Sequence, residues 1–145
     1  MIYDADCGFC KWSLALLLSL DRRGELRPLA LGTAEADRLL ADLTVAERNA
    51  SWHLVMDPAA SPAPPATAPT CPLRFSAGAA LAPALGLLPG GGIPAAAFAR
   101  FPRATERGYR WVARHRGALG RFVPARARRW ADRVIAAHDV EARPQ

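Results

Sequence analysis

The chain has 145 residues, of which 51% are hydrophobic and 22% charged, and its formal net charge is +6. This length and apolar content predict one folded domain with its own core, and they exclude a disordered chain. Three cysteines are too few for a disulfide scaffold, and no export signal is visible at the N-terminus. We therefore expect a cytoplasmic protein.

The first predicted elements are a short buried strand at residues 2–4 and a helix over residues 7–20. The helix is apolar on nearly all sides, which is typical of a buried helix, and it is too short to span a membrane. Gly24 stands in a helix-terminating position. Residues 26–31 predict a second strand, in which Pro28 favours an edge or strand-start position.

Thr33 is the predicted N-cap of a second helix. The apolar positions of that helix recur at the spacing of one face, namely Ala36, Leu39, Leu40 and Leu43. Thr44 and Glu47 match a capping box and predict a further helical turn. Residues 52–57 predict a third strand, apolar on both faces apart from His53.

Residues 58–72 are a Pro/Ala-rich loop with six prolines, in which regular structure is not expected. Residues 73–75 predict a fourth strand. Ser76 is expected to cap a third helix that Pro83 kinks.

The uncharged stretch 75–99 is long enough to cross a bilayer. Three prolines and the glycine run at 90–92 interrupt it, so continuous hydrogen bonding across lipid is not expected. We predict buried core helices joined by a turn.

Beyond residue 92 the sequence predicts two or three more helices, with Pro94, Pro102 and Pro124 in their first turns. Two of them are expected near residues 102–116 and 124–138. The order β-α-β-α-β-β-α thus occupies residues 1–92, and residues 93–145 form a basic helical extension packed on the same domain.

The extension carries most of the positive charge. Residues 100–145 hold twelve basic and four acidic side chains, whereas residues 1–57 hold six basic and nine acidic ones. A solvated helical face is favoured, because only Arg126-Ala127-Arg128-Arg129 is dense. The alternative is a contact surface for an anionic membrane or nucleic acid.

Cys7 and Cys10 are the strongest chemical signal. At i and i+3 they share one helix face, so their sulfurs can meet within bonding distance. Cys7 would stand at the helix N-terminus, where free N–H groups and the macrodipole favour a thiolate. Cys7 is therefore the candidate nucleophile and Cys10 the resolving thiol, with no bound cofactor. Lys11 would lower the thiol pKa and Asp6 would raise it, and which effect prevails stays open.

With Asp4 the pair forms an Asp-x-x-Cys-x-x-Cys motif, and residues 3–12 resemble the DCC family of predicted thiol-disulfide oxidoreductases. Looser likeness appears at residues 22–26, 51–55, 76–81 and 109–116. Ala5 departs from the glycine usual in the family. The resemblance implies a thioredoxin-like fold and disulfide exchange with a protein or small thiol substrate. Proteins of that fold commonly have a cis-proline before the third strand, beside the dithiol, but this chain has Ala50 and Ser51 there.

The roles of three neighbouring residues stay open. Asp4 is either a buried proton acceptor for Cys10 or the residue that holds the turn. Trp12 and Phe9 either pack or form an apolar rim for the substrate.

The sequence also leaves room for two other classes of function. One Cys-x-x-Cys supplies half of a zinc site. The remaining possible ligands are widely spaced, namely Cys71, His53, His115 and His138, so no metal is predicted. The second class is a non-catalytic thioredoxin-like module that binds an anionic partner through its basic helices.

Overall fold

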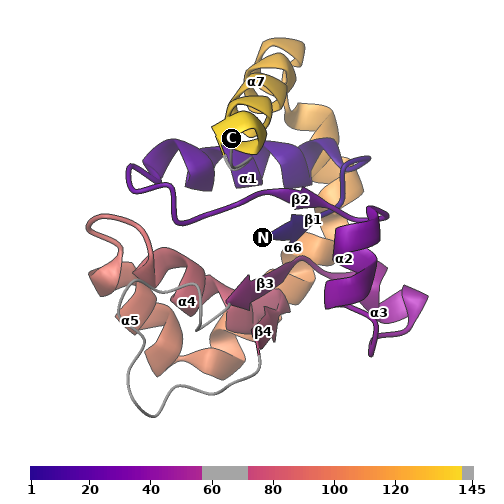
Figure 1. Cartoon of the computed structure of the whole chain (residues 1–145). Helices are drawn as coiled ribbons and strands as arrows, with labels where there is room; N and C mark the ends of the chain where they lie inside the picture. The colour runs from indigo at the N-terminus through magenta and orange to yellow at the C-terminus, as the bar shows by residue number, and fades with distance from the viewer. Residues whose placement is uncertain (57–71, 142–145) are drawn as a thin grey trace.

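The computed structural model describes residues 1–56 and 72–141, with side chains described as far as Asp139. These ranges contain four strands, seven α-helices and one 3-10 helix (Figure 1). The elements are β1 Ile2–Tyr3, α1 Gly8–Leu20, β2 Leu29–Ala30, α2 Ala34–Leu39, α3 Val45–Ala50, β3 His53–Met56, β4 Leu73–Ser76, the 3-10 helix η2 Ala77–Ala80, α4 Leu81–Gly86, α5 Gly92–Arg100, α6 Pro102–Phe122 and α7 Ala125–Glu141. The expectation of an irregular Pro/Ala-rich loop falls almost wholly outside the described residues.

The four strands form one mixed sheet in the order β2-β1-β3-β4. Strand β1 runs parallel to β2 and antiparallel to β3, so Ile2 pairs with Leu29 on one side and with His53 on the other. Strands β3 and β4 are antiparallel. The predicted α/β fold with a thioredoxin-like β-α-β-α-β-β-α order is confirmed, since α3 only adds a turn between α2 and β3.

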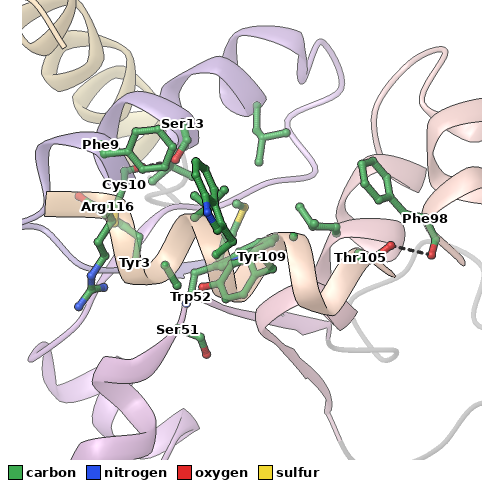
Figure 2. A pocket seen from close by; sticks show the side chains of 18 of the residues that line it. Tyr3, Phe9, Cys10, Ser13, Ser51, Trp52, Phe98, Thr105, Tyr109 and Arg116 are labelled. Atoms are coloured by element: carbon green, nitrogen blue, oxygen red, sulfur yellow. Dashed lines mark hydrogen bonds between the residues drawn. The ribbon is translucent and has the colours of Figure 1, made fainter. Parts of the chain in front are cut away.

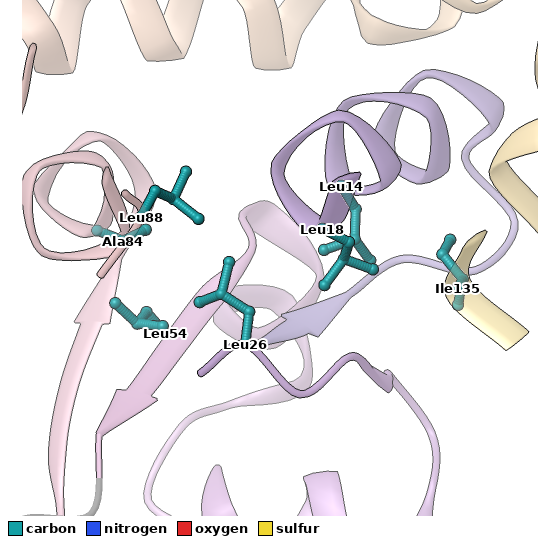
Figure 3. Close-up of a cluster of buried hydrophobic side chains, with 8 residues drawn as sticks. Leu14, Leu18, Leu26, Leu54, Ala84, Leu88 and Ile135 are labelled. Atoms are coloured by element: carbon teal, nitrogen blue, oxygen red, sulfur yellow. The ribbon is translucent and has the colours of Figure 1, made fainter. Parts of the chain in front are cut away.

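Helices cover both faces of the sheet because side chains alternate along each strand. Leu54 faces the main core, where leucines and alanines of α1, α4 and neighbouring segments meet Ile135 of α7 (Figure 3). On the opposite face Ile2 packs with Ala36 and Leu40, next to α2. The main core consists of Leu14, Leu18, Leu26, Leu54, Ala80, Ala84, Leu88 and Ile135.

Helix α1 lies between the sheet and α7 (Figure 1). Leu14, Ala15 and Leu18 are buried, but the exposed fractions of Leu16 and Leu20 are 40% and 58%. The prediction that this helix is buried on all sides was wrong, because the core takes up only one broad face of it.

Strand β2 is much shorter than the predicted residues 26–31. The reason is Asp21, which is buried at the end of α1 and whose carboxylate accepts the N–H groups of Glu25 and Leu26. These amides bond the aspartate instead of a neighbouring strand, so only Leu29–Ala30 pairs with β1. Pro28 immediately precedes this edge strand, as predicted.

Two predicted helix caps are confirmed and one is wrong. Thr33 Oγ1 accepts the N–H of Ala36, and Thr44 forms the reciprocal capping box with Glu47. Ser76 precedes a 3-10 helix and makes no side-chain cap. Its Oγ lies 2.7 Å from Nδ1 of the buried His53, so the Ser76 hydroxyl bonds a side chain of the neighbouring strand β3 and not the start of the helix.

Some of the predicted detail within the later helices also needs correction. Leu39 is part of α2, yet it is 37% exposed, because α2 ends there and Leu40 supplies the buried contact. Pro83 does not kink a long helix, because the helix is already divided where η2 gives way to α4. Helix α5 has no buried residue, so the core residues of the 75–99 stretch come from η2, from α4 and from Leu88 just after α4.

Helix α6 continues to Phe122, six residues past the predicted end. Its N-terminal half crosses η2, and this crossing is close because a Cβ on Gly78 would lie 2.9 Å from Glu106 Cα. Glu106 Oε2 accepts the N–H of Gly78 there, at 3.0 Å. Helix α7 packs along α1, burying Ala131 and Ile135, while Arg126, Arg129 and Arg133 are exposed. The division of the chain at residue 92 stays a prediction.

Candidate redox site

Cys7 and Cys10 are joined in a disulfide at the start of α1, with their Cα atoms 5.1 Å apart. Cys7 is the N-cap, with extended backbone, and its Sγ accepts the N–H of Cys10 at 3.2 Å. A helix N-terminus stabilises negative charge on a thiol. Both cysteines are partly buried, so the pair is only partly accessible to solvent.

The loop before α1 is held by Asp4. One carboxylate oxygen accepts the N–H of Asp6 at 2.9 Å, and the other lies 3.5 Å from Nη1 of Arg116. The side chain of Asp4 is 30% exposed, so the premise of a deeply buried carboxyl was wrong. Asp6 itself is exposed.

Lys11 and Trp12 lie on the flanks of the pair. The ammonium of Lys11 forms an ion pair with Asp132 of α7 at 2.8 Å, so its charge is shared with α7. The rings of Phe9 and Trp12 are 6.0 Å apart and tilted by 45°. Of these two, Phe9 lines the pocket described next and Trp12 does not.

A pocket of about 770 Å³ opens beside Cys10. Figure 2 shows it extending from Phe9, Cys10 and Arg116, past Trp52 and Tyr109, to Phe98. Its walls come from β1, α1, the segment immediately before β3, the first residue of α4, α5 and one face of α6. The α6 side of the pocket is lined by Phe101, which precedes the helix, and by Ala104, Thr105, Gly108, Tyr109, Trp111, Val112, Ala113 and Arg116. Cys10 lines this pocket whereas Cys7 does not.

Tyr109 ties this wall to the sheet. Its hydroxyl accepts the backbone N–H of Trp52 at 3.2 Å, immediately before β3. Burial raises the pKa of Tyr109 above its ordinary value, more than the Trp52 N–H lowers it, so the phenol stays uncharged at neutral pH. In the described residues no peptide bond is cis, and Ser51 and Trp52, in the segment before β3, line the pocket.

A model of the DCC1-like thiol-disulfide oxidoreductase family matches residues 1–122. The chain belongs to this family. No protein with a curated description and no solved structure matches it. The family match and the Cys-x-x-Cys pair together identify a thiol-disulfide oxidoreductase, and the match covers the helices that form the pocket as well as the sheet.

The described residues give little support for a metal site or a membrane span. Within residues 1–56 and 72–141, no three His, Cys, Asp or Glu side chains gather as metal ligands. His53 is fixed in the sheet by Ser76 and by the Arg48 carbonyl, and Cys71 lies outside the described ranges. None of the helices in the described part combines the length and the hydropathy that a membrane span requires.

Sequence reasoning missed Arg116, Tyr109 and the aromatic residues Phe98 and Phe101. Tyr109 and Arg116 lie in the stretch 109–116 that loosely resembles the family, and a stripe of small and apolar residues recurs every three or four positions from Phe101 to Val112. Such a stripe predicts packing against the domain. It does not show that the packing is incomplete and leaves a pocket.

Proposed function

We propose that this oxidoreductase exchanges disulfides through Cys7 and Cys10, with Cys7 as the nucleophile. The supporting observation is the position of Cys7 at the N-cap, where its Sγ accepts the N–H of Cys10. This hydrogen bond and the helix N-terminus both favour the thiolate. The substrate is a protein or low-molecular-weight disulfide or thiol, and no bound cofactor takes part.

In the reducing direction the Cys7 thiolate attacks one sulfur of a substrate disulfide and releases the first substrate thiolate. The Cys10 thiolate then attacks Cys7 Sγ in the mixed disulfide, forms the Cys7–Cys10 disulfide and releases the second substrate thiolate. Two electrons pass from the protein dithiol to the substrate. The oxidising direction is the reverse of these steps.

Trapping separates the two cysteines. Cys10→Ser should accumulate mixed disulfides through Cys7, because attack is retained and resolution is lost, whereas Cys7→Ser should accumulate almost none. Mass spectrometry after reaction with 2-hydroxyethyl disulfide measures both. Equal trapping by the two variants would contradict the assignment, and two independently alkylated thiols under every oxidising condition would contradict the redox pair itself.

We propose Asp4 mainly as a positioning residue, because its carboxylate is committed to Asp6 N–H and Arg116. Asp4→Asn keeps an oxygen for the turn but loses the charge, whereas Asp4→Ala loses both. If Asp4 is a positioning residue, the Asp4→Asn variant should retain most of the exchange rate and the Asp4→Ala variant should lose it. A loss with Asn, with an altered pH profile of the rate, would instead favour proton transfer to or from Cys10.

The flanking residues have smaller proposed roles. Asp6 is exposed beside Cys7 and disfavours the thiolate, while Lys11 acts less on the thiol than its position suggests, since it pairs with Asp132. Trp12 supports Phe9 through their ring contact.

The arginines of α6 are a second candidate contact site. Arg103, Arg107, Arg110, Arg114 and Arg121 are all exposed. We propose weak, sequence-independent attraction of this basic face to anionic surfaces. Binding to vesicles rich in anionic lipid should fall steeply between about 50 and 200 mM salt. Salt-insensitive, sequence-specific DNA binding would contradict this.

A further inference from the structure

Several of the polar side chains that line the pocket beside Cys10 are already engaged within the protein. Thr105 Oγ1 donates to carbonyl oxygens of Phe98 and Phe101, and Ser13 Oγ donates to the Cys10 carbonyl. Among the described lining residues, Asp4 and Arg116 are the only charged side chains, and they pair with each other. The pocket therefore presents an apolar, nearly uncharged interior to an occupant.

The same wall is poorly suited to an extended peptide. Peptides that add to a sheet rely on main-chain hydrogen bonds. Here the N–H of Trp52, which lies immediately before β3 and in the pocket wall, is already bonded to the Tyr109 hydroxyl. A volume of about 770 Å³ lies within the range of small-molecule sites.

We propose that this pocket binds the uncharged aryl or alkyl substituent of a low-molecular-weight disulfide or thiol, and so brings the substrate sulfur to the Cys7–Cys10 pair. The proposal rests on the disulfide exchange proposed above and specifies its substrate class. With dibenzyl disulfide, Cys7 attacks one sulfur and one benzyl thiolate leaves. Cys10 then attacks Cys7 Sγ and the second benzyl thiolate leaves, so one protein dithiol and one disulfide give one protein disulfide and two thiols.

Two glycines of α6 provide a matched pair of variants. Gly108 lines the pocket and Gly117 does not, although both are exposed and within the helix. Beyond the adjacent residues and the backbone of the helix itself, no atom of the described residues lies within 4 Å of a Cβ built on either glycine, so both positions have room for a larger side chain. Gly108→Leu places an isobutyl group in the pocket, while Gly117→Leu adds the same group elsewhere on the same helix.

The binding arm uses the oxidised protein and the uncharged fluorophore N-phenyl-1-naphthylamine. We expect the fluorophore to bind the wild type and Gly117→Leu equally well. Its affinity for Gly108→Leu should be lower by at least about tenfold. Equal binding by the two variants would overturn the pocket as the binding site, whatever the redox results.

The kinetic arm compares kcat/KM for dibenzyl disulfide and 2-hydroxyethyl disulfide, both of which release alkyl thiols. Gly108→Leu should lower kcat/KM about tenfold for the benzyl substrate and leave the hydroxyethyl substrate nearly unchanged, with Gly117→Leu unchanged for both. Equal effects on the two substrates would overturn the substrate class while leaving the proposed exchange in place. If the wild type turned over neither disulfide, the proposed function would fail, and fluorophore binding blocked only by Gly108→Leu would still support an apolar site.

Discussion

Gly78 is the point at which η2 and α6 come closest, and Gly78→Ala tests how much of the fold depends on that contact. The new Cβ would lie 2.9 Å from Glu106 Cα and 3.1 Å from Glu106 N, against an ordinary contact of 3.4–4 Å. It would also lie 2.8 Å from Glu106 Oε2, which can rotate away, but the backbone of α6 cannot. The two elements must therefore move apart by a few tenths of an ångström.

The expected loss follows from two opposing effects. Overpacking of this kind costs about 1–3 kcal/mol. Replacing glycine by alanine returns about 0.4–1 kcal/mol, because the unfolded chain loses conformational freedom. We expect the free energy of unfolding to fall by about 1–2 kcal/mol, and the binding of N-phenyl-1-naphthylamine to weaken as the pocket wall shifts.

Urea unfolding followed by tryptophan fluorescence measures this change, with a lower midpoint and an unchanged m-value. Gly117→Ala is the control, because its Cβ would contact nothing within 4 Å and alanine is the better helix former. That variant should be as stable as the wild type or more stable by up to about 1 kcal/mol. A Gly78→Ala variant as stable as the wild type would refute the reasoning.

Three further predictions concern stability and the remaining cysteine. Burial lowers the pKa of His53, more than its bond to the Arg48 carbonyl raises it. The folded state therefore binds fewer protons, and the free energy of unfolding should fall as the pH drops below about 6.5, with full stability above it; identical pH dependence in His53→Gln would contradict this. Thr44→Ala should lose about 1 kcal/mol of stability in urea unfolding through the capping box, whereas Thr44→Ser should lose less. Cys71→Ser should leave the exchange rate unchanged, and a large loss would assign that thiol a part in the reaction.

Local patterns in the sequence predicted much of the core domain. The N-cap position of Cys7, the cap at Thr33 and the capping box at Thr44 each depend on residues three positions apart, so they are readable without the fold. The chain order β-α-β-α-β-β-α was also predicted, and it is the order of the thioredoxin-like fold that the family resemblance implies. Strand length was less predictable, because the amides before β2 bond Asp21 instead of a neighbouring strand. The cytoplasmic location and the roles of individual site residues stay predictions.

The pocket was not predictable, because it depends on contacts between distant segments. Trp52 and Tyr109 are 57 positions apart, and the Asp4–Arg116 and Lys11–Asp132 pairs span still longer separations. No local spacing links such residues. The charge of Lys11 illustrates the difficulty, since it stands one turn from Cys7 in the sequence but forms its ion pair with α7 in the fold.

The 3.6-residue period of α6 separates two kinds of surface around one helix. Phe101, Gly108 and Val112 face the pocket, whereas Arg103, Arg110 and Arg121 fall on the opposite side, roughly half a turn away. A polyanion held by the arginines would therefore approach from behind the helix. The pocket entrance beside the disulfide would stay open to solvent. Protein adsorbed on a negatively charged support should therefore exchange small disulfides at the same rate as protein free in solution.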